Sequence, residues 1–398
     1  MSYKPSETPA GSWRLSRPRP SKRVSMDHVL LMVTMVLALI GLVMVFSASA
    51  VMAGSRFHDP GYFLKRQVVW LMVGLLLMQG MSRIDYVWWK RLAIPFLGVT
   101  VLLLVLVLVP SIGVAAKGGR RWLHAGPVLV QPAELAKLVL LMYVAAYLAK
   151  REDTITRFGR GLLPPMVVFG VVGGLVLLER DLGTVVVMGV TVMGLLFLGG
   201  ARLSHLIWLG LAGLAVVTVL VLGSSFRLQR VMVFLAPWKD PTNAGFQITQ
   251  SFLAFGHGGL FGVGLGEGRQ KLFFLPEAHT DFVLALVGEE LGLVGTASII
   301  LLFALFVVRG FHIAARARMP FGRYLGMGIT LLIGVQALIN ASVVTGLVPT
   351  KGLTLPFVSY GGSSLVTCMT GVGILLSISR DRRNGLEELG RKGRRERR

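Results

Sequence analysis

The sequence predicts an all-α, polytopic membrane protein with about ten transmembrane helices and a large extracytoplasmic loop before the eighth. Three observations lead to this prediction. The 398-residue chain is 54% hydrophobic and only 15% charged, and its mean hydropathy is +0.70. Its apolar residues form continuous runs of about 20 residues, the length at which a helix spans a bilayer. Because these runs do not alternate between polar and apolar residues, β-strands are not expected.

The expected helices follow the apolar runs in chain order. Residues 1–25 are rich in Ser, Pro and Arg and are expected to form a disordered basic tail. A transmembrane domain occupies 26–379, and residues 380–398 form a second basic tail. The first apolar run is long enough to remain as an anchor, so it is not interpreted as a cleavable signal peptide. The ten helices are predicted at 28–52, 67–82, 92–110, 133–149, 162–178, 184–200, 203–222, 282–308, 324–346 and 360–379.

Lys and Arg are unevenly distributed in this topology. Ten helices place both tails on one side, and the segments on that side hold 27 of the 41 Lys and Arg residues. By the positive-inside rule, both termini are therefore expected in the cytoplasm. The net charge of +22 is mostly this orientation signal, which argues against a nucleic-acid partner and favours contact of the tails with anionic lipid. The single cysteine, Cys368, excludes an intrachain disulfide.

Four segments lie outside the membrane in this topology, at 53–66, 111–132, 223–281 and 347–359. Only 223–281 is large, and it is rich in Phe, Leu and Gly. Phe246–Phe255 and Leu260–Leu265 within it are expected to lie along the membrane surface as amphipathic or re-entrant pieces.

The stretch 273–292 carries the densest set of ionisable residues near a helix entry. Glu277, His279, Asp281 and Glu289 lie where the eighth helix should enter the membrane. Ionisable groups at such a depth are functional candidates. Asp281 is the candidate general base.

The same stretch has a purely structural interpretation. Thr280 is a plausible N-cap, and Asp281 would then lie in the first helical turn, where a carboxylate is favoured. On a helix, Glu289 would lie about 80° around from Asp281 and Glu290 nearly opposite, so Glu289 is the better supporting carboxylate.

Metal binding is weakly indicated. His257, His279 and the nearby acids match no zinc signature, so no metal site is predicted. A loosely held Mg²⁺ that bridges a phosphate and Asp281 remains an alternative. The glycine-rich run 262–268 lacks the Lys-Ser/Thr ending of a phosphate loop, and its glycines are expected to allow tight turns.

Basic and acidic residues also flank the fourth helix. Lys137 follows Glu134 by three residues, so the two can form an ion pair at the helix entry. The alternative is an anion-binding corner for a pyrophosphate, to which Arg120 and Arg121 would contribute further donors.

Two further polar segments lie on the predicted outer side. In the turn 179–184, Asp181 is expected to cap a helix, with a place in the wall of an outward-facing polar cavity as the alternative. The run 349–364 contains two prolines and three glycines, which favour irregular backbone lining a cavity. Its Lys351 either snorkels to the membrane surface or binds substrate. Together these segments indicate an outward-facing polar cavity for an anionic, lipid-borne substrate.

Five motifs carry a resemblance that covers nearly all of the chain except the tails. PEAHTDF, GEELG, PTKGLTLPFVSYGGSS, QPAELAK and GLVMVFSAS resemble the SEDS family (shape, elongation, division and sporulation) of peptidoglycan glycosyltransferases. Ala278 and the PTKGLTLP run resemble the division branch, the FtsW type, more than the elongation branch, the RodA type. The family usually has Pro before the Asp of the turn that here reads ERDLGT, so Arg180 is a departure.

The resemblance implies a function and partners. It implies that the protein polymerises lipid II, an undecaprenyl-pyrophosphate disaccharide-peptide, at the septum of a bacterial inner membrane, as an inverting transferase. Asp281 matches the family's essential aspartate, which acts on the acceptor 4-hydroxyl, and Lys351 matches a lysine that would neutralise the leaving group. A class B penicillin-binding protein of the FtsI type and other divisome proteins would be partners.

Two other functional classes remain open. A lipid II flippase would account for ten helices equally well, but would predict discontinuous helices at mid-membrane and repeats related by pseudo-symmetry. A non-catalytic division scaffold would use Asp281 only as a helix cap, so Asn at this position would be tolerated.

Overall fold

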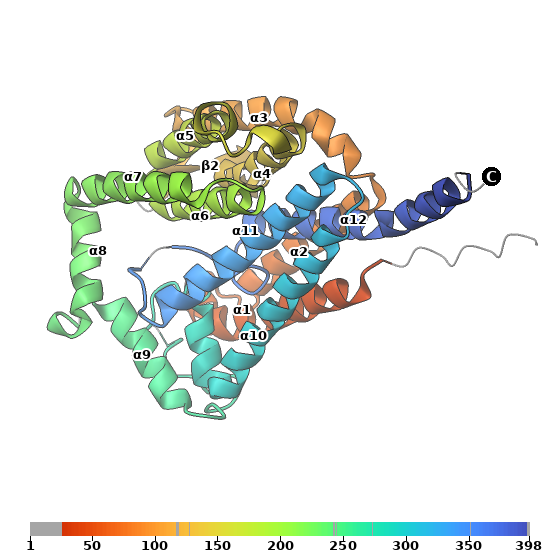
Figure 1. Ribbon diagram of the computed structural model, residues 1–398. Helices are drawn as coiled ribbons and strands as arrows, with labels where there is room; N and C mark the ends of the chain where they lie inside the picture. The colour runs from red at the N-terminus through yellow and green to blue at the C-terminus, as the bar shows by residue number, and fades with distance from the viewer. Residues whose placement is uncertain are drawn as a thin grey trace, which may run out of the picture.

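The computed structural model describes residues 26–395 apart from 117–118, 127, 242, 244, 273 and 351. Over this range the chain forms twelve α-helices and one small sheet (Figure 1). The helices are α1 (His28–Phe57), α2 (Tyr62–Arg83), α3 (Val87–Leu108), α4 (Pro132–Lys150), α5 (Leu163–Leu178), α6 (Leu182–Leu198), α7 (Leu203–Leu222), α8 (Ser225–Leu235), α9 (Phe246–Gly258), α10 (Val283–Ala315), α11 (Pro320–Val344) and α12 (Gly362–Arg395).

All ten predicted helices are present, as α1–α7 and α10–α12. Within the described residues, eight helices are long and apolar enough to cross a membrane, and the 17-residue α6 is a shorter apolar helix. The prediction of an all-α polytopic membrane protein is confirmed in this sense. Several helices are longer than their apolar runs, because α1 continues to Phe57 and α10 to Ala315.

A small antiparallel sheet follows α3 and was not predicted. Strands β1 (Gly113–Ala116), β2 (Gly119–Ala125) and β3 (Val128–Val130) are ordered β1-β2-β3. The segment 111–132 is too short and too polar for a membrane span, and its strands pair only with one another. The expectation that the chain lacks strands therefore holds for the membrane-spanning segments and fails in this loop.

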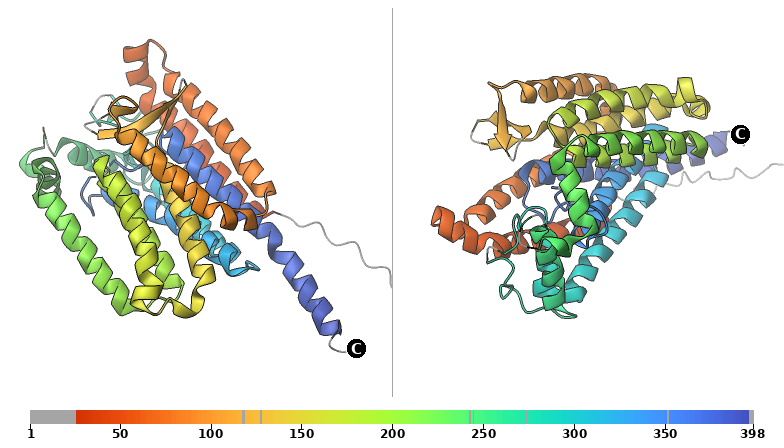
Figure 2. Two further views of the ribbon diagram at one scale, coloured as in Figure 1. Left: turned by 90° about the horizontal axis from the view of Figure 1, so that it is seen from above. Right: turned by 90° about the vertical axis from the view of Figure 1, so that its left-hand side faces the viewer.

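The core of the bundle is built around α4 and α12. Their membrane-spanning stretches are 72% and 78% buried inside the protein, whereas that of α7 is 6% buried. α12 packs along α2, α4 packs against α3 and α11, and α10 packs against α11 and α1. Figure 2 shows these long helices side by side, with the α1–α2 hairpin at the end of the molecule opposite the C-terminal end of α12.

Glycines allow the close packing of α2 against α12. A Cβ on Gly373 would lie 2.5 Å from the carbonyl oxygen of Met78, and one on Gly74 would lie 2.7 Å from the sulfur of Met369. In a bilayer the driving force between helices is close packing, so small residues at a crossing determine how near two helices approach.

The large loop is more ordered than predicted. It contains α8, a 3₁₀ turn (Pro237–Lys239) and α9. A helix forms at Phe246–Gly258, over the piece predicted at Phe246–Phe255, and its placement along the membrane surface stays a prediction. Leu260–Leu265 forms turns, with Gly262 and Gly264 at φ 82° and 111°. Positive φ is accessible to glycine without strain, as expected for the glycine-rich run.

α10 is interrupted where it meets that loop. Gly292 has φ 67° and ψ −162°, outside the helical region. The Leu293 and Val294 N–H groups, freed by this break, donate to the carbonyls of Gly259 and Leu260 at 2.9 and 3.1 Å. The loop therefore supplies hydrogen-bond acceptors for the two N–H groups that the break frees, and buried backbone N–H groups need such partners.

Candidate active site

Asp281 lies at the entrance of α10, in an extended turn rather than in the helix. The N-cap of α10 is Phe282, which is buried, and Asp281 precedes it. The prediction that Thr280 caps the helix is wrong, because the Thr280 hydroxyl donates to the carbonyl and carboxylate oxygens of Glu277. Glu277 itself has φ 55°. Thr280 thus stabilises the turn that precedes the helix.

The carboxylate of Asp281 lies against the segment after α11. A Cβ on Gly352 would lie 3.0 Å from Asp281 Oδ2. Lys351 precedes Gly352 but lies outside the described residues, so its predicted role stays a prediction. Asp281 is half-buried.

Asn340 on α11 fixes both of these segments. Its Nδ2 donates to the backbone oxygen of Asp281 at 2.9 Å and to that of Leu353 at 2.6 Å. Asn340 is 1% exposed. One buried amide therefore sets the separation between the turn of Asp281 and the chain after Gly352.

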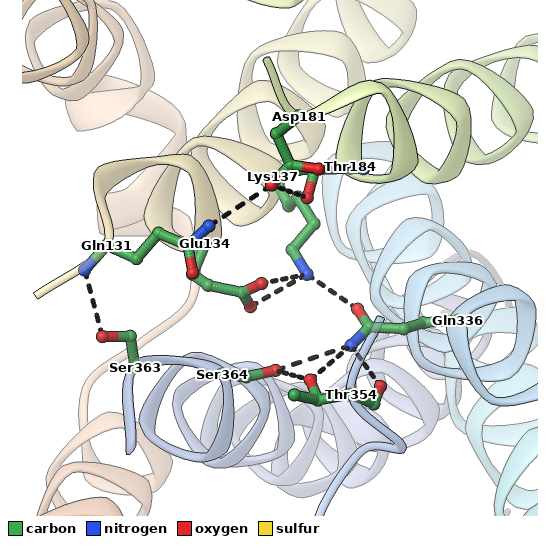
Figure 3. A network of polar contacts seen from close by, with 9 residues as sticks. All are labelled: Gln131, Glu134, Lys137, Asp181, Thr184, Gln336, Thr354, Ser363 and Ser364. Atoms are coloured by element: carbon green, nitrogen blue, oxygen red, sulfur yellow. Dashed lines mark hydrogen bonds and ion pairs between the residues drawn. The ribbon is translucent and has the colours of Figure 1, made fainter. Parts of the chain in front are cut away.

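Gln336, one turn earlier on α11, joins the same segment to a buried ion pair (Figure 3). Its Nε2 donates to the carbonyl of Thr354 at 3.0 Å. Its Oε1 accepts from Lys137 Nζ at 2.7 Å, and Lys137 also contacts the two oxygens of Glu134 at 2.8 and 2.9 Å. The predicted Glu134–Lys137 pair is confirmed. Its contacts are with protein groups, as the structural interpretation requires.

The polar network continues to the turn between α5 and α6. Asp181 caps α6 by accepting from the Thr184 N–H and hydroxyl, both at 3.0 Å, which confirms the predicted cap. Gln131 Nε2 donates to Asp181 at 3.4 Å, and the Gln131 N–H donates to the Ser363 hydroxyl at 3.1 Å (Figure 3). The entrance of α4 is thereby tied to both α6 and α12.

Arg230 supplies positive charge near Asp281. Arg230, on α8, donates to the carbonyl of Thr350 at 3.2 Å. Desolvation lowers the pKa of Arg230, the negative charge of Asp281 raises it, and the positive charge of Arg121 lowers it. Arg230 is therefore within electrostatic range of both Asp281 and Arg121. Arg230 was not among the predicted site residues.

The two predicted arginines of β2 differ in their surroundings. Arg121 Nε and Nη2 donate to the carbonyls of Glu179 and Arg180 at 3.1 and 2.7 Å. Arg180 occupies the left-handed region at φ 64°, so Arg121 stabilises a strained turn. Arg120 is half-buried and pairs with Ala115 in the sheet.

His279 is buried rather than free in the cavity. Its ring lies 4.7 Å from that of Phe63 and 5.7 Å from that of Tyr360. Its carbonyl accepts from the Tyr360 N–H at 2.9 Å. His279 therefore packs the turn of Asp281 against the chain that precedes α12.

Glu289 lies away from Asp281, because it serves the loop beside the α10 break. It is 1% exposed, and its Oε1 accepts from the Arg269 N–H at 2.8 Å. His257 Nδ1 lies 4.0 Å from the same oxygen, and an open pocket of about 400 Å³ adjoins these residues. Glu289 lies about 9 Å along the helix axis from Val283, the first residue of α10, and Asp281 precedes that residue. Glu289 is thus positioned to stabilise the loop rather than to support the base.

Glu290 has a comparable structural role. Its carboxylate accepts from the Ser47 hydroxyl at 2.6 and 2.8 Å and pairs with Lys271 at 2.9 Å. Among the described residues, no group of three or more His, Cys, Asp and Glu is arranged to hold a metal ion.

Glu179 is the most unusual acid in the site region. It is fully buried, and neither carboxylate oxygen has a hydrogen-bond partner. Burial, and secondly the negative charge of Asp181, raise the pKa of Glu179 from 4.5 to about 8, while Arg121 opposes the shift. A carboxyl group with a raised pKa holds its proton in the folded state at a pH where the unfolded chain has released it.

This pKa predicts a pH-dependent stability. Between about pH 5 and pH 8, Glu179 is protonated in the folded protein and ionised in the unfolded chain. The thermal midpoint should therefore fall as the pH rises through this range, and Glu179 should favour the folded state least above pH 8. Glu179→Gln should make the thermal midpoint less dependent on pH. The contribution of Glu179 to the change in the free energy of unfolding over this range is at most about 5 kcal/mol. Thermal unfolding of purified protein across this range measures it, with the exposed Glu267→Gln as control. Parallel curves for wild type and Glu179→Gln would contradict the prediction.

Sequence reasoning missed three residues of the site, and two of them had a readable signal. Gln336 and Asn340 are polar residues four apart in an otherwise apolar run, so they share one helix face and are typical of an interhelical polar contact. Arg230 had no such signal, because it is one of several basic residues in the large loop.

A known protein family matches nearly the whole chain. The model of the cell cycle protein family of FtsW, RodA and SpoVE matches residues 27–384. A probable peptidoglycan glycosyltransferase FtsW from Geobacter sulfurreducens is 48% identical over 353 residues, covering 89% of this chain and 95% of the relative. Stage V sporulation protein E of Bacillus subtilis is 42% identical over 360 residues, covering 90% and 98%.

Solved structures give the same match at the level of the fold. One chain of a peptidoglycan synthase complex, described for its coordination of polymerization and crosslinking, superposes with a TM-score of 0.73 at 32% identity and covers 90% of this chain and 99% of its own length. The rod shape determining protein RodA of Thermus thermophilus superposes with a TM-score of 0.67 at 31% identity, covering 90% and 98%.

Proposed function

The chain belongs to the FtsW, RodA and SpoVE family of cell cycle proteins, and we propose that its glycosyltransferase reaction takes place at Asp281. The chain is a multi-pass membrane protein and a peptidoglycan glycosyltransferase of the FtsW type. The observation that carries the proposal is the double hydrogen bond from Asn340, which fixes the turn of Asp281 against the segment after α11. This arrangement holds a half-buried carboxylate in a defined place beside basic side chains.

The proposed reaction joins two lipid II molecules or a growing strand and one lipid II. Asp281 accepts the proton of the acceptor's 4-hydroxyl as that oxygen attacks the anomeric carbon of the donor chain. The bond from that carbon to the pyrophosphate oxygen breaks, undecaprenyl pyrophosphate leaves, and the configuration inverts. The substrate and the role of Asp281 are both proposals.

Basic side chains would stabilise the charge of the departing pyrophosphate. Arg230 is the leading candidate, because its positive charge is within electrostatic range of Asp281. Lys351 would act with it, and Arg120 is a further donor. Arg121 holds the turn at Glu179 and supports the site indirectly. Positive groups aimed at developing negative charge are a large source of rate enhancement.

The cellular setting is likewise proposed. The protein would act in the bacterial inner membrane at the division septum, with both termini in the cytoplasm. A class B penicillin-binding protein would be its crosslinking partner, and the structural similarity to a synthase complex that coordinates polymerization with crosslinking supports this pairing.

The test is polymerisation of purified lipid II in detergent by the protein co-purified with its penicillin-binding partner. We expect ladders of glycan strands on a gel. Transport requires two compartments, which detergent removes, so a flippase would yield no ladders. If a folded complex with an active partner gave no ladders, the transferase proposal would be contradicted. Parallel reactions with Mg²⁺ and with a chelator test the divalent cation that the sequence left open.

A further inference from the structure

A continuous cluster of aromatic rings connects the protein surface with the turn of Asp281. Phe57 at the end of α1 stacks on Tyr62 at the start of α2, with centroids 4.1 Å apart. Tyr62 contacts Phe63 at 5.2 Å, and Phe63 contacts both His279 and Tyr360 at 4.7 and 5.1 Å. We call these five residues the aromatic ladder.

The ladder ends beside the proposed base. His279 is two residues before Asp281, and its carbonyl accepts from the Tyr360 N–H. The rings become progressively less exposed toward this end, since Phe57 is 39% exposed and His279 8%. The ladder is therefore exposed at Phe57 and buried at His279, beside the turn of Asp281.

The surroundings of the ladder are aqueous rather than hydrocarbon. The exposed Arg56 and Arg66 lie over the rings of Phe57 and Tyr62 at 5.7 and 5.0 Å, and the adjacent Asp59–Lys65 pair is also exposed. α1 has 30 residues, about 45 Å of helix against about 30 Å of hydrocarbon, so part of it extends beyond the bilayer core. The charged Arg56 in its last turn favours that end. Four charged side chains therefore surround the outer rings. This is more charge than aromatic residues that only anchor a helix at the membrane interface require.

We propose that the aromatic ladder binds the sugar rings of the glycan strand beside Asp281, and that Arg56 and Arg66 meet carboxylates of the stem peptides. This inference rests on the proposed function, because it assigns a binding surface to the strand made there. The axial C–H groups of a pyranose ring carry partial positive charge and match the negative face of an aromatic ring. The Tyr and His polar atoms offer hydrogen bonds to hydroxyl and N-acetyl groups.

The ladder also has the right placement for a growing strand. The acceptor sugar must lie against the base, and the sugars beyond it must leave the site in one direction. The row of rings runs from the buried His279 to the exposed Phe57 and gives the strand one direction of exit. Phe57 and Tyr62 stack on each other, and Arg56 and Arg66 lie over them. A sugar ring therefore binds there by displacing these arginines, including the hydrogen bond of Arg66 to Tyr360. Weak, repeated contacts of this kind would hold the strand between additions and allow it to slide.

Binding of a preformed glycan tests the proposal without requiring catalysis. The probe is a soluble GlcNAc–MurNAc oligosaccharide, with its stem peptides either intact or removed, added to protein in nanodiscs. Phe57→Ala combined with Tyr62→Ala should weaken binding of both probes about tenfold or more, as truncation of aromatic anchors does. Phe57→Tyr combined with Tyr62→Phe preserves the rings and should retain affinity. Phe261→Ala, at a residue 81% exposed in the loop after α9, is the matched control.

The outcomes separate the ladder from the proposed base. Equal affinity of wild type and the double alanine variant, loss of affinity in Phe261→Ala to the same degree, or binding only through the peptides would each overturn the ladder. An active Asp281→Asn together with weakened binding in the double alanine variant would reject the base and uphold the ladder. In the polymerisation assay, the double alanine variant should give shorter strands.

Discussion

Replacement of Asp281 by Asn is expected to reduce glycan polymerisation by about 10²- to 10⁴-fold, the typical contribution of a general base. Asn has nearly the same shape as Asp but cannot accept the hydroxyl proton. The structural contacts of Asp281 with Asn340 and Glu277 run through its backbone oxygen and nitrogen. Asn would keep both, and the thermal midpoint shows whether the variant folds as wild type does.

The measurement is the initial rate of polymerisation beside the thermal midpoint of the same preparation. Glu267→Gln, an exposed loop acid, is the control and should polymerise like wild type. A fully active Asp281→Asn variant would show that Asp281 is not the general base. An inactive variant with an unchanged midpoint would also exclude the scaffold interpretation, which requires only a cap. That interpretation already has less support, because Asp281 precedes the N-cap Phe282.

The helices could be predicted from the sequence because each membrane span is a continuous apolar run. Their ends could not, because α1 and α10 continue past the hydrocarbon into residues such as Arg56 and His312. Water can solvate the ends of a helix there, so hydropathy no longer marks its limit. The sheet after α3 was missed because its strands are only 3 to 7 residues long.

Within the site, local partners could be predicted and distant ones could not. Glu134 and Lys137 are three residues apart on one helix, so their pairing follows from helical spacing. Asn340 and Asp281 are 59 residues apart, and nothing in either local sequence indicates the contact. Glu289 was expected beside Asp281 on helical geometry alone. The loop that covers the break at Gly292 gives that carboxylate backbone donors of its own.

Substitution of Lys137 by Met is expected to destabilise the protein by about 3–5 kcal/mol, because it leaves the Glu134 carboxylate buried without its partner. Both side chains are buried, at 2% and 9% exposed. Glu134→Gln combined with Lys137→Met removes the charge and should restore most of the thermal midpoint. A single variant as stable as wild type would show that the pair is not the buried ion pair described here.

Activity of the double variant distinguishes the two interpretations of the pair. Lys137 fixes Gln336, and Gln336 holds Thr354 in the segment that lies against Asp281 (Figure 3). Loss of Lys137 should therefore move this segment, and displacements of about 1 Å far from the chemistry can reduce a rate about 10²-fold. We expect a stable double variant with impaired polymerisation and unchanged apparent affinity for lipid II. A selective loss of affinity would instead place Lys137 in contact with the pyrophosphate, as an anion-binding corner requires, and a fully active double variant would limit the pair to folding.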